Sequence, residues 1–440
     1  MKTIVMGAGL AGISAALMLH DAGHRVSIIS TGLGGVLLSP GTVDIAGWAR
    51  TGAPIFDPYA AVDSACSPHP YAVIGVDAVR SGVNWLLEHT ELFATPTEHN
   101  ILVPTGVGAV RPTLTAPKTF HRLEDGQRLL VVGIKQFKDF PAQLIADNLE
   151  RSPLVNVHAR AITIDFPVRE NEADSTGTNI ARALDTPAGR AQLATALRGQ
   201  LRAGETVLLP AILGLNPASF ADLRAKLDAP VGEVAVPPPS IPGRRLHDEL
   251  VSQLRKARID LALNATVVGF TADGERVQTL QARRAGRITS EKVAAVVYAG
   301  GGFESGSLSR AVTGEISERV FGLPVQPAPN IFSSYVGVDC AMRPLDASGK
   351  PLYTNLHLAG TILGGAEPWA EKSGEGIALG SAWAAASAIQ SYVSAPSHPA
   401  ANDHPASDNQ PAPSKPASNG HPASNDHPAP SKPAAKGENR

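Results

Sequence analysis

The chain has 440 residues, 43% of them hydrophobic, which is enough for two or three packed domains with a large core. Its formal net charge of −2 and the lack of a long basic run exclude a nucleic-acid surface built on attraction to phosphates. Cys66 and Cys340 are the only cysteines, so the chain holds neither a disulfide framework nor an iron–sulfur cluster, which needs about four cysteine ligands. This cysteine content suits a reducing compartment, and no metal site is predicted.

The chain opens with the pattern of a βαβ unit. Residues 4–6 form a predicted short buried strand, Leu10–Asp21 a helix rich in alanine and leucine, and residues 25–29 a second strand. A strand followed closely by a helix and a second strand is typical of a parallel α/β sheet.

The turn between the first strand and the helix reads "GAGLAG" and has the G-x-G-x-x-G spacing of a dinucleotide-binding loop. Gly7 permits a tight turn, Gly9 lets a phosphate approach the backbone, and Gly12 allows the helix to pack closely on the strand. The helix N-terminus then attracts the anion. We therefore predict a nucleotide or flavin phosphate site formed by Gly7, Gly9, Leu10, Ala11 and Gly12, with a glycine-rich structural turn as the alternative.

The same apolar run, residues 3–19, follows Lys2 and could pass for a secretory signal. The glycines interrupt it at the spacing of the loop, which favours the nucleotide-binding interpretation. No other stretch approaches the ~18 apolar residues of a membrane span. The sequence therefore predicts a soluble chain.

Ser30 stands directly after the second predicted strand. Dinucleotide sites commonly place an acidic residue here, whose carboxylate binds the adenosine ribose. We predict that Ser30 lies in the cofactor site and ask what a site without this carboxylate binds.

The segment "LLSPGTVDIAGWA", residues 37–49, comes next. Flavin oxidoreductases use this position to lay polar groups and backbone amides along the isoalloxazine ring. The candidates are Ser39, Gly41, Thr42 and Asp44, with an ordinary surface turn as the alternative.

The middle of the chain alternates apolar runs with helical patterns. The runs "RLLVVGI" (Arg128–Ile134), "TVLLPAILG" (206–214) and "KVAAVVYAGGGF" (292–303) suit strands buried on both faces of an α/β sheet. Residues 140–149 and 243–257 read as helices. We predict an α/β fold with a Rossmann-like flavin-binding domain formed by residues 1–60 and 290–394, and an inserted α+β substrate or cap region over residues 61–289.

Two glycine-rich stretches near the C-terminus extend the predicted site. "VVYAGGGF" (296–303) and "NLHLAGTILGG" (355–365) look like late strands of flavoproteins, which commonly follow the late glycine with an aspartate where Thr361 stands here. A helix then follows, whose N-terminus could stabilise negative charge on a reduced flavin ring or simply pack on the sheet. The cofactor candidates are Gly300, Gly301, Gly360, Thr361, Gly364, Gly365, Gly374 and Gly376.

From residue 395 the composition changes. Residues 395–440 contain almost no large apolar side chain, and "PAPSKPA" occurs twice. Such a segment cannot bury enough surface to offset its ordering entropy. We predict a disordered tail rich in proline, alanine and histidine, whose histidines could at most bind a metal opportunistically.

A series of blocks along the chain resembles one particular family. The blocks are "LSPGTVDIAG", "PHPYAVIG", "LLVVGIKQFKDFPAQLIADNL", "TNIARALD", "VLLPAILGL", "PPPSIPGRRLHDEL" and "NLHLAGTILGG", in this order. Together they resemble the B subunit of anaerobic glycerol-3-phosphate dehydrogenase over roughly residues 1–392. Several of them, such as "NIARALD", are not general flavoprotein features.

The resemblance implies a flavoprotein that takes part in oxidising sn-glycerol 3-phosphate to dihydroxyacetone phosphate in glycerol catabolism. Electrons would pass to quinone, with fumarate or nitrate as terminal acceptor. The implied partners are an FAD-bearing A subunit and an iron–sulfur, membrane-attached C subunit. The implied location is the cytoplasm, peripheral to the inner face of the cell membrane and attached only through the partner.

The resemblance also implies FMN as the cofactor. FMN has no adenosine ribose, so an acid at position 30 would have nothing to hold. A serine hydroxyl can still bond to a ribose hydroxyl, so FAD stays an alternative.

No catalytic residue is assigned. Histidine is the natural acceptor for a hydroxyl proton, which draws attention to His69 and His357, and the acids Glu367, Glu371 and Glu375 lie nearby in the sequence. Guanidinium groups suit a substrate phosphate. Arg182 and Arg244 lie inside family-like blocks and are predicted to bind it, whereas Arg111 does not, and structural salt bridges are the alternative for each.

Two other functions remain open at this point. One is a stand-alone FAD-dependent oxidoreductase that acts on a small hydroxy or 2-oxo acid. The other is a scaffold subunit that has lost its cofactor.

Overall fold

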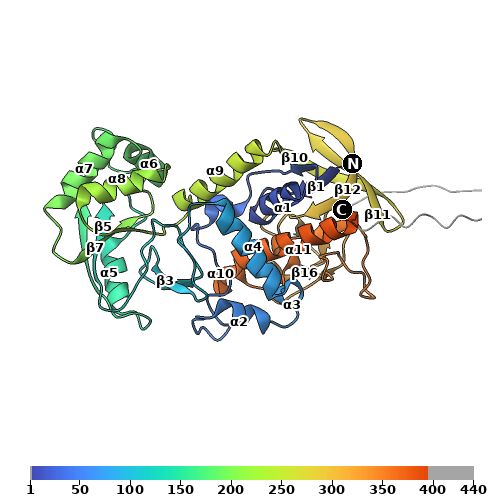
Figure 1. The fold of residues 1–440 in the computed structure, drawn as a ribbon, viewed down its shortest axis with the longest axis horizontal. Helices are drawn as coiled ribbons and strands as arrows, with labels where there is room; N and C mark the ends of the chain where they lie inside the picture. The colour runs from blue at the N-terminus through green and yellow to red at the C-terminus, as the bar shows by residue number, and fades with distance from the viewer. Residues whose placement is uncertain (1, 395–440) are drawn as a thin grey trace, which may run out of the picture. The chain divides into compact units, whose positions relative to one another are not determined.

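The computed structural model describes residues 2–394 of the chain. The predicted tail, residues 395–440, lies outside the described residues. The described part forms one compact unit with two hydrophobic cores (Figure 1).

The larger sheet has seven strands and contains the predicted βαβ unit. Its strands are β1 (Lys2–Met6), β2 (Val26–Ile29), β9 (Asp260–Ala262), β10 (Ala265–Asp273), β11 (Arg276–Arg284), β12 (Arg287–Tyr298) and β17 (Leu356–Leu358). Their order is β10-β11-β12-β1-β2-β9, with β17 also paired to β12. The start of β12 pairs antiparallel with β11, while its end pairs parallel with β1 and β17. One strand therefore joins a parallel sheet to an antiparallel hairpin.

Three helices pack together beside this sheet. They are α1 (Leu10–Asp21), α4 (Val76–His89) and α11 (Gly374–Ser394), and α11 contacts both of the others. Small residues permit the close crossing, because a Cβ atom on Gly82 of α4 would lie 2.3 Å from the Leu379 carbonyl oxygen of α11. In Figure 1 the late helix α11 (orange-red) lies beside the early helices α1 and α4 (blue). The two ends of the chain therefore share one core.

The second sheet has four strands, all parallel, in the order β6-β5-β7-β8. They are β5 (Arg128–Ile134), β6 (His158–Ile164), β7 (Glu205–Pro210) and β8 (Val231–Val234), and the accompanying helices are α5 (Ala142–Glu150), α6 (Gly177–Leu184), α7 (Pro187–Arg198) and α8 (Ala218–Leu227). The apolar run of β5 is buried from Leu129 to Ile134, as expected for a central parallel strand covered on both faces. This sheet is of the α/β type, where the sequence pattern favours α+β.

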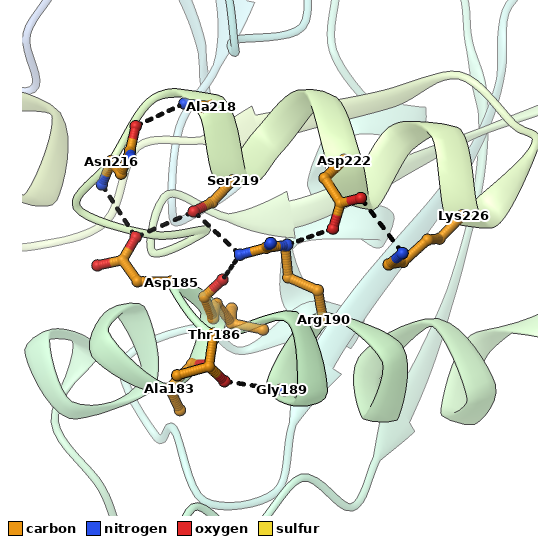
Figure 2. Close-up of polar contacts among 11 residues, drawn as sticks. Ala183, Asp185, Thr186, Gly189, Arg190, Asn216, Ala218, Ser219, Asp222 and Lys226 are labelled. Atoms are coloured by element: carbon orange, nitrogen blue, oxygen red, sulfur yellow. Dashed lines mark hydrogen bonds and ion pairs between the residues drawn. The ribbon is translucent and has the colours of Figure 1, made fainter.

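A closed polar network holds the corner between α6, α7 and α8 (Figure 2). The Asp185 carboxylate accepts hydrogen bonds from the Ser219 hydroxyl and the Asn216 N–H, at 3.0 Å each. The Arg190 guanidinium pairs with the Asp222 carboxylate. Each of these charged groups has a partner, so the network stabilises the fold.

Helix α9 (Ile241–Lys256) follows β8 and leads back to the larger sheet. Ile241 packs in the core of the second sheet, while Leu246 and Leu250 pack in the core of the first. The buried Arg245 side chain donates to the Glu233 carboxylate at 2.6 and 3.0 Å and to the Gly214 carbonyl at 2.6 and 2.9 Å. This helix therefore ties the two cores together.

Shorter elements complete the described chain. They are α2 (Pro58–Asp63), α3 (Tyr71–Ile74), α10 (Pro368–Glu371), β3 (Ile101–Pro104), β4 (Val110–Thr113), β13 (Leu308–Arg310), β14 (Ile316–Glu318), β15 (Val325–Gln326), β16 (Tyr335–Val336) and the 3-10 turns η1 (Gly35–Leu38), η2 (Ile331–Ser333) and η3 (Gly360–Leu363).

The predicted inserted region, residues 61–289, does not stand apart from the first sheet. β9, β10 and β11 are strands of that sheet, and α4 packs on α11. The two sheets have separate hydrophobic cores. The domain boundaries at residues 60 and 290 stay a prediction. The short strand β9 and the largely polar hairpin β10–β11 carry too weak a hydrophobic pattern to be assigned to a sheet from sequence.

Candidate functional site

The glycine loop after β1 is shaped to receive an anion. A Cβ atom on Gly7, whose φ is +108°, would lie 2.2 Å from the Ala299 carbonyl oxygen, and one on Gly12 would lie 2.0 Å from the Gly7 carbonyl oxygen. Gly9, by contrast, has nothing within 4 Å of its Cβ position. It begins α1 without a side-chain cap, so the first N–H groups of this helix are free to bind a ligand.

The loop lines a cavity of about 750 Å³, which we call the glycine cavity. Its walls come from the ends of β1, β2 and β12, from η3 and from the start of α11. The predicted cofactor residues among its lining are Gly7, Gly9, Leu10, Ala11, Ser30, Ser39, Gly300, Gly301, Gly360, Thr361 and Gly374. The fold therefore gathers residues from both ends of the chain around one space.

Other predicted cofactor residues lie outside this lining. Gly12, Gly41 and Gly376 are packing positions: a Cβ atom on Gly41 would lie 2.8 Å from Pro242 Cβ, and one on Gly376 would lie 2.2 Å from the Tyr71 hydroxyl. Gly364 and Gly365 also have positive φ and press against neighbouring backbone. Their direct contact with a cofactor stays a prediction.

Ser30 uses its hydroxyl within the protein. Its Oγ donates to the Gly32 carbonyl at 2.7 Å and accepts from the Ala8 N–H at 3.2 Å. The side chain therefore braces the glycine loop against the segment that follows β2. Its only hydroxyl proton is already donated.

A charged cluster lies beside the start of α11. The Ser39 hydroxyl donates to the Glu375 carboxylate at 3.1 Å. Burial raises the pKa of the Glu375 carboxyl, and the Arg111 guanidinium opposes this rise. Arg111 itself pairs with the buried Asp44, which also accepts from the Thr113 hydroxyl at 2.7 Å.

This cluster changes the interpretation of three predicted residues. Asp44 lies in a buried ion pair and not in the lining of the glycine cavity. The Thr42 hydroxyl is buried and has no hydrogen-bond partner among the described residues. Arg111 forms the structural salt bridge that the sequence analysis gave as its alternative role, but its partner is 67 residues away and could not be named from sequence.

An apolar cavity of about 390 Å³ adjoins the glycine cavity and shares Glu304, Thr361 and Gly374 with it. Phe332, Trp369 and Ile377 are among its walls. The Thr361 hydroxyl donates to the Glu304 carboxylate at 3.1 Å at the junction. A space of this kind suits a planar aromatic ring better than a charged group.

Of the histidines and acids considered as catalytic residues, Glu375 lines the glycine cavity, whereas His69, His357, Glu367 and Glu371 do not. His69 Nε2 lies 3.3 Å from the Glu371 carboxylate, and Glu367 accepts from the Asn330 side-chain amide at 3.0 Å. His357 is buried and donates from Nδ1 to the Ala341 carbonyl at 2.7 Å. Burial lowers the pKa of His357, so it is held neutral.

The two arginines predicted to bind substrate phosphate lie away from the glycine cavity. Arg182 is exposed on α6. Arg244 is exposed on α9 and pairs with Asp248 at 3.0 Å. Neither lines the glycine cavity or the apolar cavity, and their role stays a prediction.

The residues present fit a flavin nucleotide. Open space over Gly9 and the uncapped start of α1 suit a phosphate, while the adjoining apolar walls suit a ring. Among residues 2–394, no helix combines the length and apolarity needed to cross a membrane.

Comparison with known proteins agrees with this geometry. The FAD binding domain family matches residues 2–377. A probable B subunit of anaerobic glycerol-3-phosphate dehydrogenase from Halobacterium salinarum (strain ATCC 29341 / DSM 671 / R1) is 30% identical over 422 residues, covering 89% of this chain and 98% of the relative. The B subunit of the same enzyme from Yersinia pestis bv. Antiqua (strain Antiqua) is 29% identical over 417 residues, covering 86% and 95%.

Among solved structures, a 3-ketosteroid Δ1-dehydrogenase from Sterolibacterium denitrificans is 12% identical, with a TM-score of 0.44, covering 89% of this chain and 99% of that one. The family match spans the glycine loop, both sheets and the start of α11, and the expected resemblance and flavin cofactor are thereby confirmed. The chain belongs to the FAD binding domain family and, within it, to the family of anaerobic glycerol-3-phosphate dehydrogenase B subunits.

Proposed function

We propose that this chain is a flavin-bearing subunit of a complex that oxidises sn-glycerol 3-phosphate to dihydroxyacetone phosphate. The names of its relatives and the glycine cavity support the proposal. Electrons leave the complex toward quinone through a partner that carries iron–sulfur clusters, since Cys66 and Cys340 cannot ligate a cluster themselves. The partners are an FAD-bearing A subunit and a membrane-attached C subunit, at the cytoplasmic face of the membrane.

The size of the glycine cavity favours FAD over the FMN that the family resemblance implies. Its lining continues past the glycine loop to Thr31, Thr266 and Arg319. FMN would leave this part of the cavity to water, whereas the adenosine half of FAD would fill it. The missing carboxylate at Ser30 argues for FMN, but a ribose hydroxyl can be satisfied by water, and the extent of the cavity matches the longer FAD better.

The roles of the chain's own residues follow from their positions. The free N–H groups at the start of α1 bind the phosphate, and the N-terminus of α11 favours negative charge at the ring. Glu375 lies in the cavity wall, where burial raises the pKa of its carboxyl and the Arg111 guanidinium opposes this rise. When bound, a flavin supplies a two-electron acceptor for hydride.

Identifying the released flavin tests the proposal directly. We would purify the full-length chain, release the flavin by heat and identify it by chromatography. FAD supports the assignment, and FMN overturns the choice of cofactor while leaving a flavoprotein. A colourless chain that binds its partner subunits but takes up neither flavin would instead indicate a scaffold.

Activity of the isolated chain tests its dependence on the complex. Flavin-loaded protein that rapidly oxidises a small hydroxy acid with a soluble acceptor would favour a stand-alone oxidoreductase. We expect oxidation of glycerol 3-phosphate with quinone reduction to require the reconstituted complex.

A further inference from the structure

A third cavity, of about 700 Å³, lies beyond the apolar cavity and shares Ala366 and Trp369 with it. Arg50 and Lys372 line it, together with Glu367 and Glu371. We call it the cationic cavity after the two basic residues. The apolar cavity shares lining residues with the glycine cavity on one side and with the cationic cavity on the other. A ligand in the cationic cavity would therefore border the space assigned to the flavin ring.

Backbone hydrogen bonds fix Arg50 beside Lys372. The N–H groups of Gly47 and Trp48 donate to the Glu371 carbonyl at 2.8 and 3.0 Å. A tight turn then closes where the Gly52 N–H donates to the Ala49 carbonyl at 2.8 Å, with Arg50 inside the turn. Arg50 and Lys372 are 322 positions apart in the sequence. The hydrogen bonds from Gly47 and Trp48 to Glu371 bring their two segments together.

The charges of the cavity are unequally satisfied. Glu367 already accepts from Asn330 at 3.0 Å, and Glu371 accepts from Ser373 at 3.2 Å and lies 3.3 Å from His69 Nε2. Within residues 2–394, neither Arg50 nor Lys372 forms an ion pair with a carboxylate. The Lys372 ammonium donates instead to the Trp369 carbonyl.

The ammonium of Lys372 is partly buried among charges of both signs. Burial lowers its pKa and the Arg111 guanidinium lowers it further, while the Glu375 carboxylate opposes this shift. Two cations without carboxylate partners, beside a space large enough for a small molecule, are a ready site for an anion with several oxygens.

We infer that the cationic cavity binds a small phosphate monoester, with its phosphate at Arg50 and Lys372 and its carbon chain directed past Trp369 toward the apolar cavity. This inference rests on the proposed function in one respect, because it takes the flavin ring to lie in the apolar cavity. It replaces Arg182 and Arg244 as the phosphate-binding residues.

Titration calorimetry on the full-length, flavin-loaded chain tests the inference. The probes are glycerol 3-phosphate, inorganic phosphate and glycerol. We expect glycerol 3-phosphate to bind, inorganic phosphate to compete with it, and glycerol to bind far more weakly because it lacks the charge. Failure of inorganic phosphate to compete, or equal binding of glycerol, overturns the inference.

Substitutions locate the site. Arg50→Gln and Lys372→Gln should each weaken glycerol 3-phosphate binding about 10- to 100-fold, the range expected for losing a charge-assisted hydrogen bond. The control Arg198→Gln removes another exposed arginine, on α7, and should leave binding unchanged. Equal binding by the wild type and both cavity variants, or a loss caused by Arg182→Gln alone, contradicts the assignment.

The flavin absorbance of the same samples separates the two proposals. Arg50 does not line the glycine cavity, so Arg50→Gln should keep its flavin. A wild-type chain that contains no flavin would contradict the proposed function. A flavin-containing chain that does not bind glycerol 3-phosphate would contradict only the inference about the cationic cavity.

Discussion

Polar groups are paired to different extents in two regions of the molecule. One region is the corner between α6, α7 and α8, and the other is the surroundings of the glycine cavity. In the corner, Asp185 and Arg190 each bond to side chains of the neighbouring helices (Figure 2). Around the glycine cavity, the start of α1 is uncapped. Outside its lining, the buried Thr42 hydroxyl and Arg111 Nε also lack partners among the described residues. Buried polar groups left unpaired cost free energy, which a bound ligand can return. The first region is built for stability and the second to receive a molecule.

The largest expected effect tests the closed networks of the second sheet. Arg245→Met removes the partner of the fully buried Glu233 and should lower the free energy of unfolding by about 3–5 kcal/mol, measured by urea denaturation. Arg244→Met, which breaks the exposed pair with Asp248, is the matched control and should change stability little. Similar losses in both variants would show that burial of the pair is not what matters.

Gly9→Ala tests whether the loop after β1 is built for a ligand. The added Cβ atom meets no protein atom, and the φ of −77° is open to alanine, so folding should be unchanged. The methyl group would keep a phosphate from the backbone and should weaken flavin binding about 10- to 100-fold.

The control for this variant is Gly199→Ala at the end of α7. Gly199 also has an ordinary φ of −76° and nothing within 4 Å of its Cβ position. Flavin content and affinity, read by absorbance and fluorescence titration, should match the wild type. Undiminished flavin affinity in Gly9→Ala would refute the phosphate site.

A pair of threonines sharpens the comparison within the second region, the surroundings of the glycine cavity. Thr113→Val removes the hydroxyl that donates to Asp44 at 2.7 Å and should cost about 1.5–3 kcal/mol of stability. Thr42→Val removes a hydroxyl without a protein partner and should leave the flavin-free chain as stable or slightly more so. Thermal unfolding of the flavin-free proteins measures both. If Thr42→Val is as destabilising as Thr113→Val, the hydroxyl has a structural partner after all.

Acid should destabilise the chain slightly through its buried histidines. Burial lowers the pKa of His357 in the first sheet and of His121 near the second, below the usual value of 6.5. The unfolded chain therefore binds protons first as the pH falls below 6.5, so the free energy of unfolding falls, by up to about 1 kcal/mol per histidine over the first pH unit. About one pH unit above 6.5 both histidines are almost entirely neutral in both states, and the effect vanishes.

His357→Asn should flatten this decline more than His121→Asn, because His357 is the more deeply buried. Urea denaturation between pH 5.5 and 7.5 measures the slope. A decline that is unchanged in both variants would assign the acid sensitivity to carboxylates.

Local patterns predicted the parts of the site that depend on neighbouring residues. The helix Leu10–Asp21 is confirmed at both ends, because its glycine loop and its apolar content are local signals. The central strand Arg128–Ile134 is likewise confirmed, since a continuous apolar run is what a doubly covered strand requires.

Long-range pairings could not be predicted in the same way. The fold brings distant segments together, so that Arg111 pairs with Asp44 and Arg50 lines the same cavity as Lys372. Nothing in the sequence around Arg50 marks it as a ligand-binding residue. A single sequence reports which residues can bind a phosphate, but only the tertiary structure tells which of them share a cavity.

The parallel end of β12 has a consequence for synthesis of the protein. The Ala299 N–H donates to the Met6 carbonyl, and Gly360 and Gly374 complete the wall opposite the loop after β1. A ribosome makes the loop within the first dozen residues and this wall only after most of the chain has emerged. A nascent chain therefore cannot retain the coenzyme until residues 360–378 have been made, and products that terminate before residue 360 should be colourless.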